Sequence, residues 1–123
     1  MSLVETPLIT LLSHALELTA QRQSLVSQNV ANIDTPGYHA RDIDFRQELQ
    51  RAMLVEAADQ PGGNTPLVRG VPGLVERPDG NNVNIDRESL LMAQNQLQFQ
   101  TQVTLLRSEF SRLQEAINGG GGQ

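Results

Sequence analysis

Residues 86–117 read DRESLLMAQNQLQFQTQVTLLRSEFSRLQEAI, and this stretch is the clearest helix in the chain. From Phe99 onward its apolar residues recur in alternating steps of four and three, the heptad spacing of a helix that packs along another helix. The stretch therefore predicts a helix about 48 Å long. Its apolar stripe consists of Met92, Phe99, Val103, Leu106, Phe110, Leu113 and Ile117.

The residues around this helix indicate where it begins and ends. Asn84 or Asp86 can cap its first turn, because both side chains accept hydrogen bonds from free backbone N–H groups. Asn118 and Gly119 predict its end, since both tolerate the left-handed backbone of a C-terminal cap. We expect residues 119–122, four glycines, to form a flexible tail.

A second long helix is predicted from about Thr6 to Ile33. Thr6 can cap it, and Pro7 suits the first helical position. At 100° per residue one face collects Leu8, Leu12, Ala15, Val26, Val30 and Ile33, while Leu11, Leu18 and Leu25 repeat every seven residues along its flank. The helix would be about 40 Å long. We expect the two long helices to pair as a coiled coil, antiparallel or parallel.

The segment between them, residues 34–82, is rich in proline and glycine. Pro36 favours an extended Thr35, and Pro36-Gly37 suits the central positions of a type II turn. Phe45, Leu49 and Met53 have the spacing of a short helix. The rest predicts loop, with a short hairpin formed by residues 67–68 and 74–75.

The predicted fold class is therefore all-α, with a small irregular central segment. Residues 1–33 form the N-terminal helix, residues 34–82 the turn and centre, and residues 83–123 the C-terminal helix with its glycine-rich tail. One domain is built from both termini. The expected helix–helix packing residues are Leu12, Leu18, Leu25, Val26, Val30, Met92, Phe99, Val103, Leu106, Phe110 and Leu113.

The C-terminal helix is apolar on more than one side. Leu90, Ala93 and Leu97 lie away from the Phe99 stripe, and Leu91 with Leu105 lie on another flank. A helix that is apolar on several sides is normally buried on several sides, and one partner helix cannot cover it. Either the central segment folds back over it or neighbouring copies cover it, and we favour the copies. Some of the alternating glutamines at 94–102 would then lie at subunit contacts.

The composition argues against several classes of function. Net charge is -5, and the nine basic residues, all arginine, are scattered from Arg22 to Arg112, whereas a nucleic-acid binder concentrates them. The chain has no cysteine, so disulfides, thiolate zinc sites and cysteine nucleophiles are excluded. His39 with Asp42 and Asp44 matches no metal-ligand spacing. We expect no cofactor, no metal, no catalytic residues and no small-molecule substrate, and hence not an enzyme.

The N-terminus has no basic region, and the apolar cluster at residues 8–12 is too short for a cleaved signal or a membrane span. A route out of the cytoplasm would therefore have to work without a cleaved signal peptide.

Residues 28–38, QNVANIDTPGY, closely resemble the N-terminal signature of flagellar axial proteins, which runs Asn-Ile-Ala-Asn, two variable residues, then Thr-Pro-Gly-Tyr. Val30 replaces the isoleucine. The stretch GNNVNIDRE at 80–88, continuing as MAQNQLQFQ at 92–100, looks like the proximal type of the flagellar basal-body rod protein family. The family favours an acid at Asn84, Glu at Asp86, Met at Ser89 and Tyr at Phe99. The assembly motif that the resemblance assigns is Asn29, Asn32, Thr35, Pro36, Gly37 and Tyr38.

The resemblance implies a self-assembling structural subunit of the rod that crosses the periplasm and transmits torque. It implies export through the flagellar type III gate, and contacts with copies of the chain, with the rod proteins FlgC, FlgF and FlgG, with FliE and with the membrane-embedded ring. A small cytoplasmic helical adaptor or export chaperone is the main alternative, and it would be stably folded by itself. A rod subunit should be poorly ordered as a monomer, because its helices lack partners.

Overall fold

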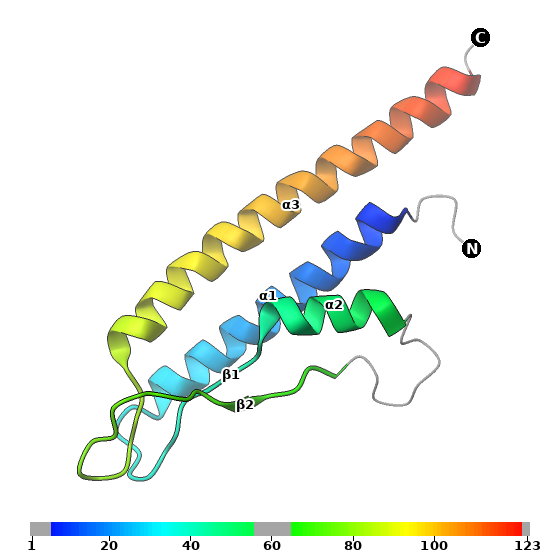
Figure 1. Ribbon diagram of the computed structural model, residues 1–123. Coiled ribbons are helices and arrows are strands. Elements are labelled where there is room, and N and C mark those ends of the chain that lie inside the picture. Colours follow the sequence, from blue (N-terminus) through cyan, green and yellow to red (C-terminus); the bar gives the residue numbers. More distant parts are fainter. Residues whose placement is uncertain (1–5, 56–64, 122–123) are drawn as a thin grey trace.

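The computed structural model describes residues 6–55 and 65–121. Within these ranges the order of elements is α1 (Pro7–Ala31), β1 (Arg41–Asp42), α2 (Phe45–Val55), β2 (Arg69–Gly70) and α3 (Ile85–Gly121). Figure 1 shows α1 and α3 side by side as a long helical pair, with α2 and β1 against α1 and with β2 beside β1. The mostly helical fold with two long packed helices is as predicted.

Both long helices begin at capping residues that the sequence predicted. The Thr6 hydroxyl oxygen accepts the N–H of Ile9 at 3.1 Å, and Pro7 is the first residue of α1. At α3 the cap is Asn84 rather than Asp86, since Asn84 Oδ1 accepts the N–H of Arg87 at 3.0 Å. α1 ends at Ala31, two residues before the predicted Ile33.

The predicted end of α3 at Asn118–Gly119 is wrong, because the helix continues to Gly121. Glycine lowers helix stability by about 1 kcal/mol per residue but does not forbid the conformation, and no proline follows to stop it. Gly122, the last residue of the expected tail, lies outside the described residues.

The two long helices are antiparallel, which three cross-helix hydrogen bonds establish. Asn29 of α1 donates to Glu88 of α3 at 2.7 Å, near the turn that ends α1. Asn95 donates to Gln23 at 3.0 Å, and Thr19 donates to Gln102 at 3.0 Å. The residue numbers of the partners on α1 fall from 29 to 19 while those on α3 rise from 88 to 102, so the two helices run in opposite directions.

The seam of α3 against α1 is unusually polar. Four of the buried residues in the described part of α3 are Glu88, Asn95, Gln102 and Glu109, at steps of seven, with Leu91 as the buried apolar residue. The apolar heptad stripe lies on one side of this seam: Met92, Phe99 and Phe110 are exposed, and Val103, Leu106 and Leu113 are half-buried. The α3 side chains that are buried against α1 are therefore mostly amides and carboxylates. The apolar side chains of α3 lie beside this seam.

The apolar core lies between α1 and the central segment. Leu18 and Leu25 of α1 are buried against Ile43, and Phe45 and Leu49 of α2 pack on the same cluster. α2 makes its helix contacts with α1 and none with α3 in the part of the chain that is described. The central segment thus folds back, but over the N-terminal helix, and it leaves the outer faces of α3 uncovered.

The centre is more regular than the fold class predicted. The short helix at Phe45, Leu49 and Met53 is confirmed as α2. The hairpin of residues 67–68 with 74–75 is wrong: β2 instead pairs antiparallel with β1, with Arg41 opposite Gly70. β1 follows the turn after α1, and its exposed backbone groups pair with β2 when the chain returns. Residues 56–64, including the predicted loop at 61–63, lie outside the described residues.

Neither long helix contains a described stretch apolar enough to cross a membrane.

Candidate functional site

The turn after α1 has the geometry that its residues predicted. The N–H of Tyr38 donates to the carbonyl of Thr35 at 3.2 Å, and Gly37 has φ +76°, as the third position of a type II turn requires. Asn32 closes the helix end, since its amide donates to the carbonyl of Gln28 at 2.8 Å. Thr35 in turn donates its hydroxyl to Asn32 Oδ1 at 3.1 Å. Residues 32–38 are therefore held by hydrogen bonds among themselves and to the last turn of α1.

A second turn, residues 77–83, is organised around Asn81, whose side chain is fully buried. Its amide donates to two carbonyls of the first turn, those of Asn32 and Thr35, each at 2.8 Å. Its Oδ1 accepts the N–H of Val83 at 2.8 Å. One side chain thus adds a second hydrogen bond to two carbonyls of the turn after α1 and also shapes the approach to α3.

The two turns bind one another through backbone groups as well, and we call the pair, residues 32–40 and 77–83, the clasp. Gly37 N–H donates to the carbonyl of Asp79 at 2.9 Å, and Asn82 N–H donates to the carbonyl of Tyr38 at 3.2 Å. Arg77 donates to the carbonyl of Ile33. Gly80 has φ +86°, and a Cβ added there would lie 3.2 Å from the Gly37 Cα. The clasp therefore requires glycine at its point of closest approach.

Asn29 connects the clasp to both long helices. Its side chain is 1% exposed, and the residue lies two positions before Ala31, the last residue of α1. Its amide donates to the carbonyl of Arg41 at 2.9 Å and to Glu88 at 2.7 Å. Its Oδ1 accepts the N–H of Arg41 at 3.0 Å and the hydroxyl of Tyr38 at 3.1 Å. The side chain thus pairs with the extended chain as a neighbouring strand would, and every hydrogen-bonding direction of the amide is used.

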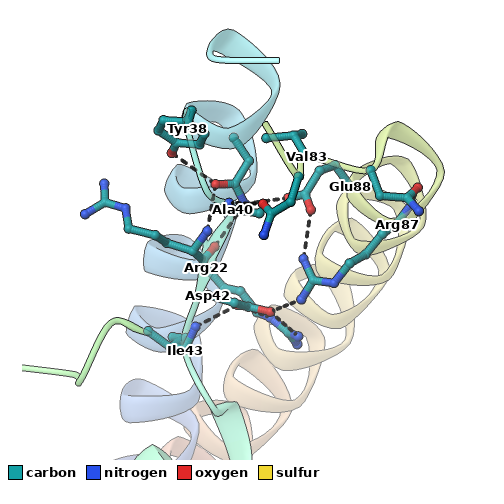
Figure 2. A network of polar contacts seen from close by, with 12 residues as sticks. Arg22, Tyr38, Ala40, Asp42, Ile43, Val83, Arg87 and Glu88 are labelled. Carbon is teal, nitrogen blue, oxygen red and sulfur yellow. Dashed lines mark hydrogen bonds and ion pairs between the residues drawn. The ribbon is translucent and has the colours of Figure 1, made fainter. Parts of the chain in front are cut away.

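Beside the clasp lies a partly buried network of charges (Figure 2). Arg22 of α1 binds both oxygens of Asp42, at 2.9 and 3.0 Å. Arg87 of α3 donates to Asp42 at 2.6 Å and to Glu88 at 2.8 Å. Glu88 is fully buried, and Asn29 donates to its other oxygen. The network joins α1, β1 and α3, and it leaves neither carboxylate without donors.

The charge state of Asp42 follows from its neighbours. Burial by itself would raise the pKa of Asp42, but Arg22, the N–H of Ile43 and Arg87 outweigh burial and hold that pKa below its ordinary value of 3.8. Asp42 is therefore ionised in the folded chain at neutral pH, as a carboxylate between two guanidinium groups should be.

Acid should weaken this junction. Because the pKa of Asp42 is lower in the folded chain, its contribution to stability is present above about pH 3.8 and is lost as the pH falls through the folded value. We expect Asp42→Asn to lower the free energy of unfolding at pH 7 by about 2 kcal/mol and to flatten its dependence on pH between 5 and 3. Urea unfolding across this range measures both effects. Asp34→Asn, at an exposed position, is the control, and an unchanged pH dependence in Asp42→Asn would contradict the assignment.

The residues of the predicted assembly motif are brought together at the clasp. Asn29, Asn32, Thr35 and Tyr38 make the hydrogen bonds described above, Gly37 takes the left-handed conformation, and Pro36 is exposed. Their role in assembly stays a prediction. Sequence reasoning missed the residues that complete this junction, either in contact with the motif or connected to it through Glu88, which are Arg22, Asp42, Gly80, Asn81, Asn82, Arg87 and Glu88. The stretch at 80–88 was the available signal, since five of these seven residues lie within it.

The packing residues divide between the two helices. Leu12, Leu18, Leu25 and Val26 of α1 are buried within the subunit, and Val30 is half-buried. Met92, Phe99 and Phe110 of α3 are between 41% and 48% exposed. Their packing against other helices therefore stays a prediction about the assembled subunit.

No group of three or more histidine or acidic side chains suited to a metal ion occurs among the residues that the structure describes. His39 pairs with Glu76 at 3.1 Å on the surface rather than with Asp42 or Asp44. The side chains of the site serve to hold backbone segments in place.

Comparison with known proteins agrees with this architecture. Residues 10–39, which contain most of α1 and the first turn, match the family described as "Flagella basal body rod protein". The flagellar basal body rod protein FlgB of Salmonella typhimurium is 37% identical, over 86% of this chain and 89% of that protein. FlgB of Cereibacter sphaeroides is 39% identical, over 87% and 91%, and FlgB of Escherichia coli is 35% identical, over 86% and 89%.

The predicted resemblance to flagellar basal-body rod proteins, most like FlgB, is confirmed by these relatives, and with it the structural rather than enzymatic role. Two long paired helices, a Thr-Pro-Gly-Tyr turn clasped by a second turn, and near full-length similarity to FlgB lead to one conclusion: this chain belongs to the flagellar basal body rod protein family and is a structural subunit of the flagellar basal body.

Proposed function

We propose that the chain is a subunit of the proximal rod, in which its uncovered α3 faces are buried by neighbouring subunits. The observation that carries this proposal is the mismatch between the two sides of α3. Leu90 and Leu97 are 59% and 67% exposed, and Leu105 and Phe99 are about half exposed, whereas the side turned to α1 is polar. Contiguous exposed apolar surface on a helix is typical of an interaction site.

The absence of charged residues from the middle of α3 supports a close-packed environment. Residues 89–106 contain no Asp, Glu, Arg or Lys. A solvated helix face normally carries charges, whereas amides can form hydrogen bonds between packed helices without the desolvation cost of a buried ion. Gln94 and Gln100 are exposed in the subunit and available for such contacts, while Gln102 is already used inside it.

A groove between α1 and α3 offers a specific place for a neighbour. It is lined by Ala20, Met92 and Phe99 together with Asn95 and Gln96. Asn95 Oδ1 is buried and accepts no hydrogen bond from the described residues. In this proposal α1 and α3 continue as coiled-coil partners of helices in adjacent subunits.

In this role the subunit contacts its own copies and other axial components, of which FlgC, FlgF, FlgG, FliE and the membrane-embedded ring are the proposed set. It reaches the periplasm by the flagellar type III route and transmits torque through packed helices. The clasp would be the ordered end of the free subunit. The exposed half of α3 would gain stability only on assembly, since an isolated helix without tertiary contacts is marginal in water.

The proposal is tested by making the α3 face polar. Leu97→Gln should change the stability of the free chain by less than about 0.5 kcal/mol, because this side chain is exposed. It should weaken assembly by about 2 kcal/mol per subunit, the value of one buried leucine. The measurement is motility, and the amount of the chain in purified basal bodies, in cells where it is the sole source of this subunit.

The matched control is Leu54→Gln on α2, where the leucine is 84% exposed but lies away from α3. Normal motility and normal rods in Leu97→Gln, or equal losses in both variants, would contradict burial of the α3 face. A free chain that is compact and fully protected from hydrogen exchange along both long helices would favour the adaptor or chaperone alternative.

A further inference from the structure

Arginine side chains gather along one open groove beside the charge network, and we call it the arginine groove. It lies where α1, β1, the start of α2, β2 and the start of α3 meet, with Ile43, Phe45 and Val71 among its apolar walls. Four arginines and two aspartates line it: Arg22, Arg46, Arg69, Arg87, Asp42 and Asp44. A surplus of positive charge is notable here because the chain as a whole carries -5.

Two of these arginines are free to bind a ligand. Arg22 and Arg87 are held by Asp42 and Glu88 inside the network. Arg46 and Arg69 have no carboxylate partner among the described residues, and both are exposed. Arg69 donates one N–H to Gln47 at 2.6 Å, which orients the guanidinium and leaves its other donors available. The groove therefore presents two guanidinium groups, a geometry suited to carboxylates.

The same chain carries an acidic surface at the clasp. Asp34 and Asp79 are exposed on the two turns, and Glu76 is exposed directly before the second turn, where it pairs with His39 at 3.1 Å. Arg77 donates to the carbonyls of Ile33 and Val83 at the base of the turns, and its Nε also lies 4.0 Å from Asp79 Oδ1, an exposed ion pair that contributes little. Two carboxylates thus stand on loops whose backbone is held by the clasp hydrogen bonds, and Glu76 stands directly beside them, so the three are near one another before any contact forms.

We infer that the arginine groove of one subunit receives the acidic clasp of the next copy. This inference rests on the proposed function, in which copies pack together. The two surfaces are different parts of one chain, so the contact is head-to-tail, and head-to-tail contacts build open helical assemblies rather than closed dimers. Opposite charges at the contact also offset the repulsion between copies of an acidic chain.

Charge reversal tests the pairing. Arg46→Glu/Arg69→Glu makes the groove acidic, and Asp34→Arg/Glu76→Arg makes the clasp basic. We expect each double variant alone to self-associate about tenfold more weakly than the unmodified chain in sedimentation at low salt, since several exposed ion pairs are lost and replaced by like charges. Mixing the two variants should restore association, because each groove then meets an opposite charge. The association recovered on mixing should be weaker at 0.5 M salt, because salt screens the charges.

A chemical cross-link tests the geometry independently of affinity. The chain has no cysteine, so Arg69→Cys/Glu76→Cys introduces the only two thiols. Oxidation should produce a ladder of linked oligomers, whereas the two single variants mixed together should stop at dimers. Glu115→Cys in place of Glu76→Cys, at an exposed position on α3, is the control and should give no ladder. Circular dichroism verifies folding, and Arg46→Glu alone serves if the double variant is unfolded.

Three results would overturn the inference. These are no self-association of the unmodified chain, no recovery on mixing the reversed variants, and a ladder from the control cysteine. If the reversed groove instead loses binding to phosphatidylglycerol vesicles while association is unchanged, its ligand is a membrane surface and not a copy. Each of these can occur while Leu97→Gln still blocks rod assembly, so the groove can fail without the proposed function failing.

Discussion

Replacing Asn29 by alanine should open the junction of α1, the clasp and α3. The change removes four hydrogen bonds at a side chain that is 1% exposed, and it leaves Glu88 buried without one of its donors. We expect the free energy of unfolding to fall by about 3 kcal/mol or more. Urea unfolding measures this loss, and hydrogen exchange should show faster exchange at the Arg41 N–H, whose acceptor is gone.

Two further variants sharpen this test. Asn29→Asp keeps the acceptor for Arg41 and Tyr38 but places a second carboxylate against Glu88, so we expect it to be no better than alanine at pH 7. Gln21→Ala, at an exposed position on the same helix, should change the stability by less than about 0.5 kcal/mol. Similar losses in Asn29→Ala and Gln21→Ala would show that the network does not hold the junction.

Gly80→Ala should be the most damaging of the glycine substitutions. Its φ is +86°, and the new Cβ would lie 3.2 Å from the Gly37 Cα, a backbone atom that cannot move without disturbing the first turn. We expect a loss of about 2–3 kcal/mol, the sum of a left-handed alanine and a tight backbone contact. Because Gly37 and Gly80 are held together in the clasp, rod incorporation should fall with stability.

Gly73→Ala is the matched control for this prediction. Gly73 has φ +78°, but nothing lies within 4 Å of an added Cβ, so only the conformational cost of about 1 kcal/mol applies. Comparing Gly73→Ala with Gly80→Ala separates the cost of a left-handed alanine from the cost of the contact with Gly37. Equal stabilities of Gly73→Ala and Gly80→Ala, measured by thermal or urea unfolding, would exclude a role for the contact between the turns.

Local sequence patterns predicted the elements well because the forces that form them are local. Thr6-Pro7 caps α1, Asn84 caps α3, Pro36-Gly37 makes the turn, and the spacing of Phe45, Leu49 and Met53 forms α2. Where the local rule was a weak preference it was wrong, as at Gly119, because a glycine penalty is small compared with continuing a 37-residue helix.

Partners distant in the sequence could not be predicted in the same way. The apolar periodicity of α3 placed the seam on the Phe99 stripe, yet the seam uses Glu88, Asn95 and Gln102. Each of these has a hydrogen-bonding partner on α1, and such complementarity is visible only when both helices are in place. The same holds for Asn81, which looks like an ordinary turn residue until its two carbonyl acceptors are found 46 and 49 residues away.

The amino-acid sequence by itself determined the two long helices, the turn between α1 and the centre, the excess of apolar surface on α3 and the resemblance to rod proteins, since periodicity, capping and φ preferences act within a few residues. Tertiary structure alone decided the antiparallel direction, the polar seam, the clasp and the side of α3 left uncovered. Those depend on which backbone carbonyls and buried charges find donors across the fold, and no local pattern specifies that choice.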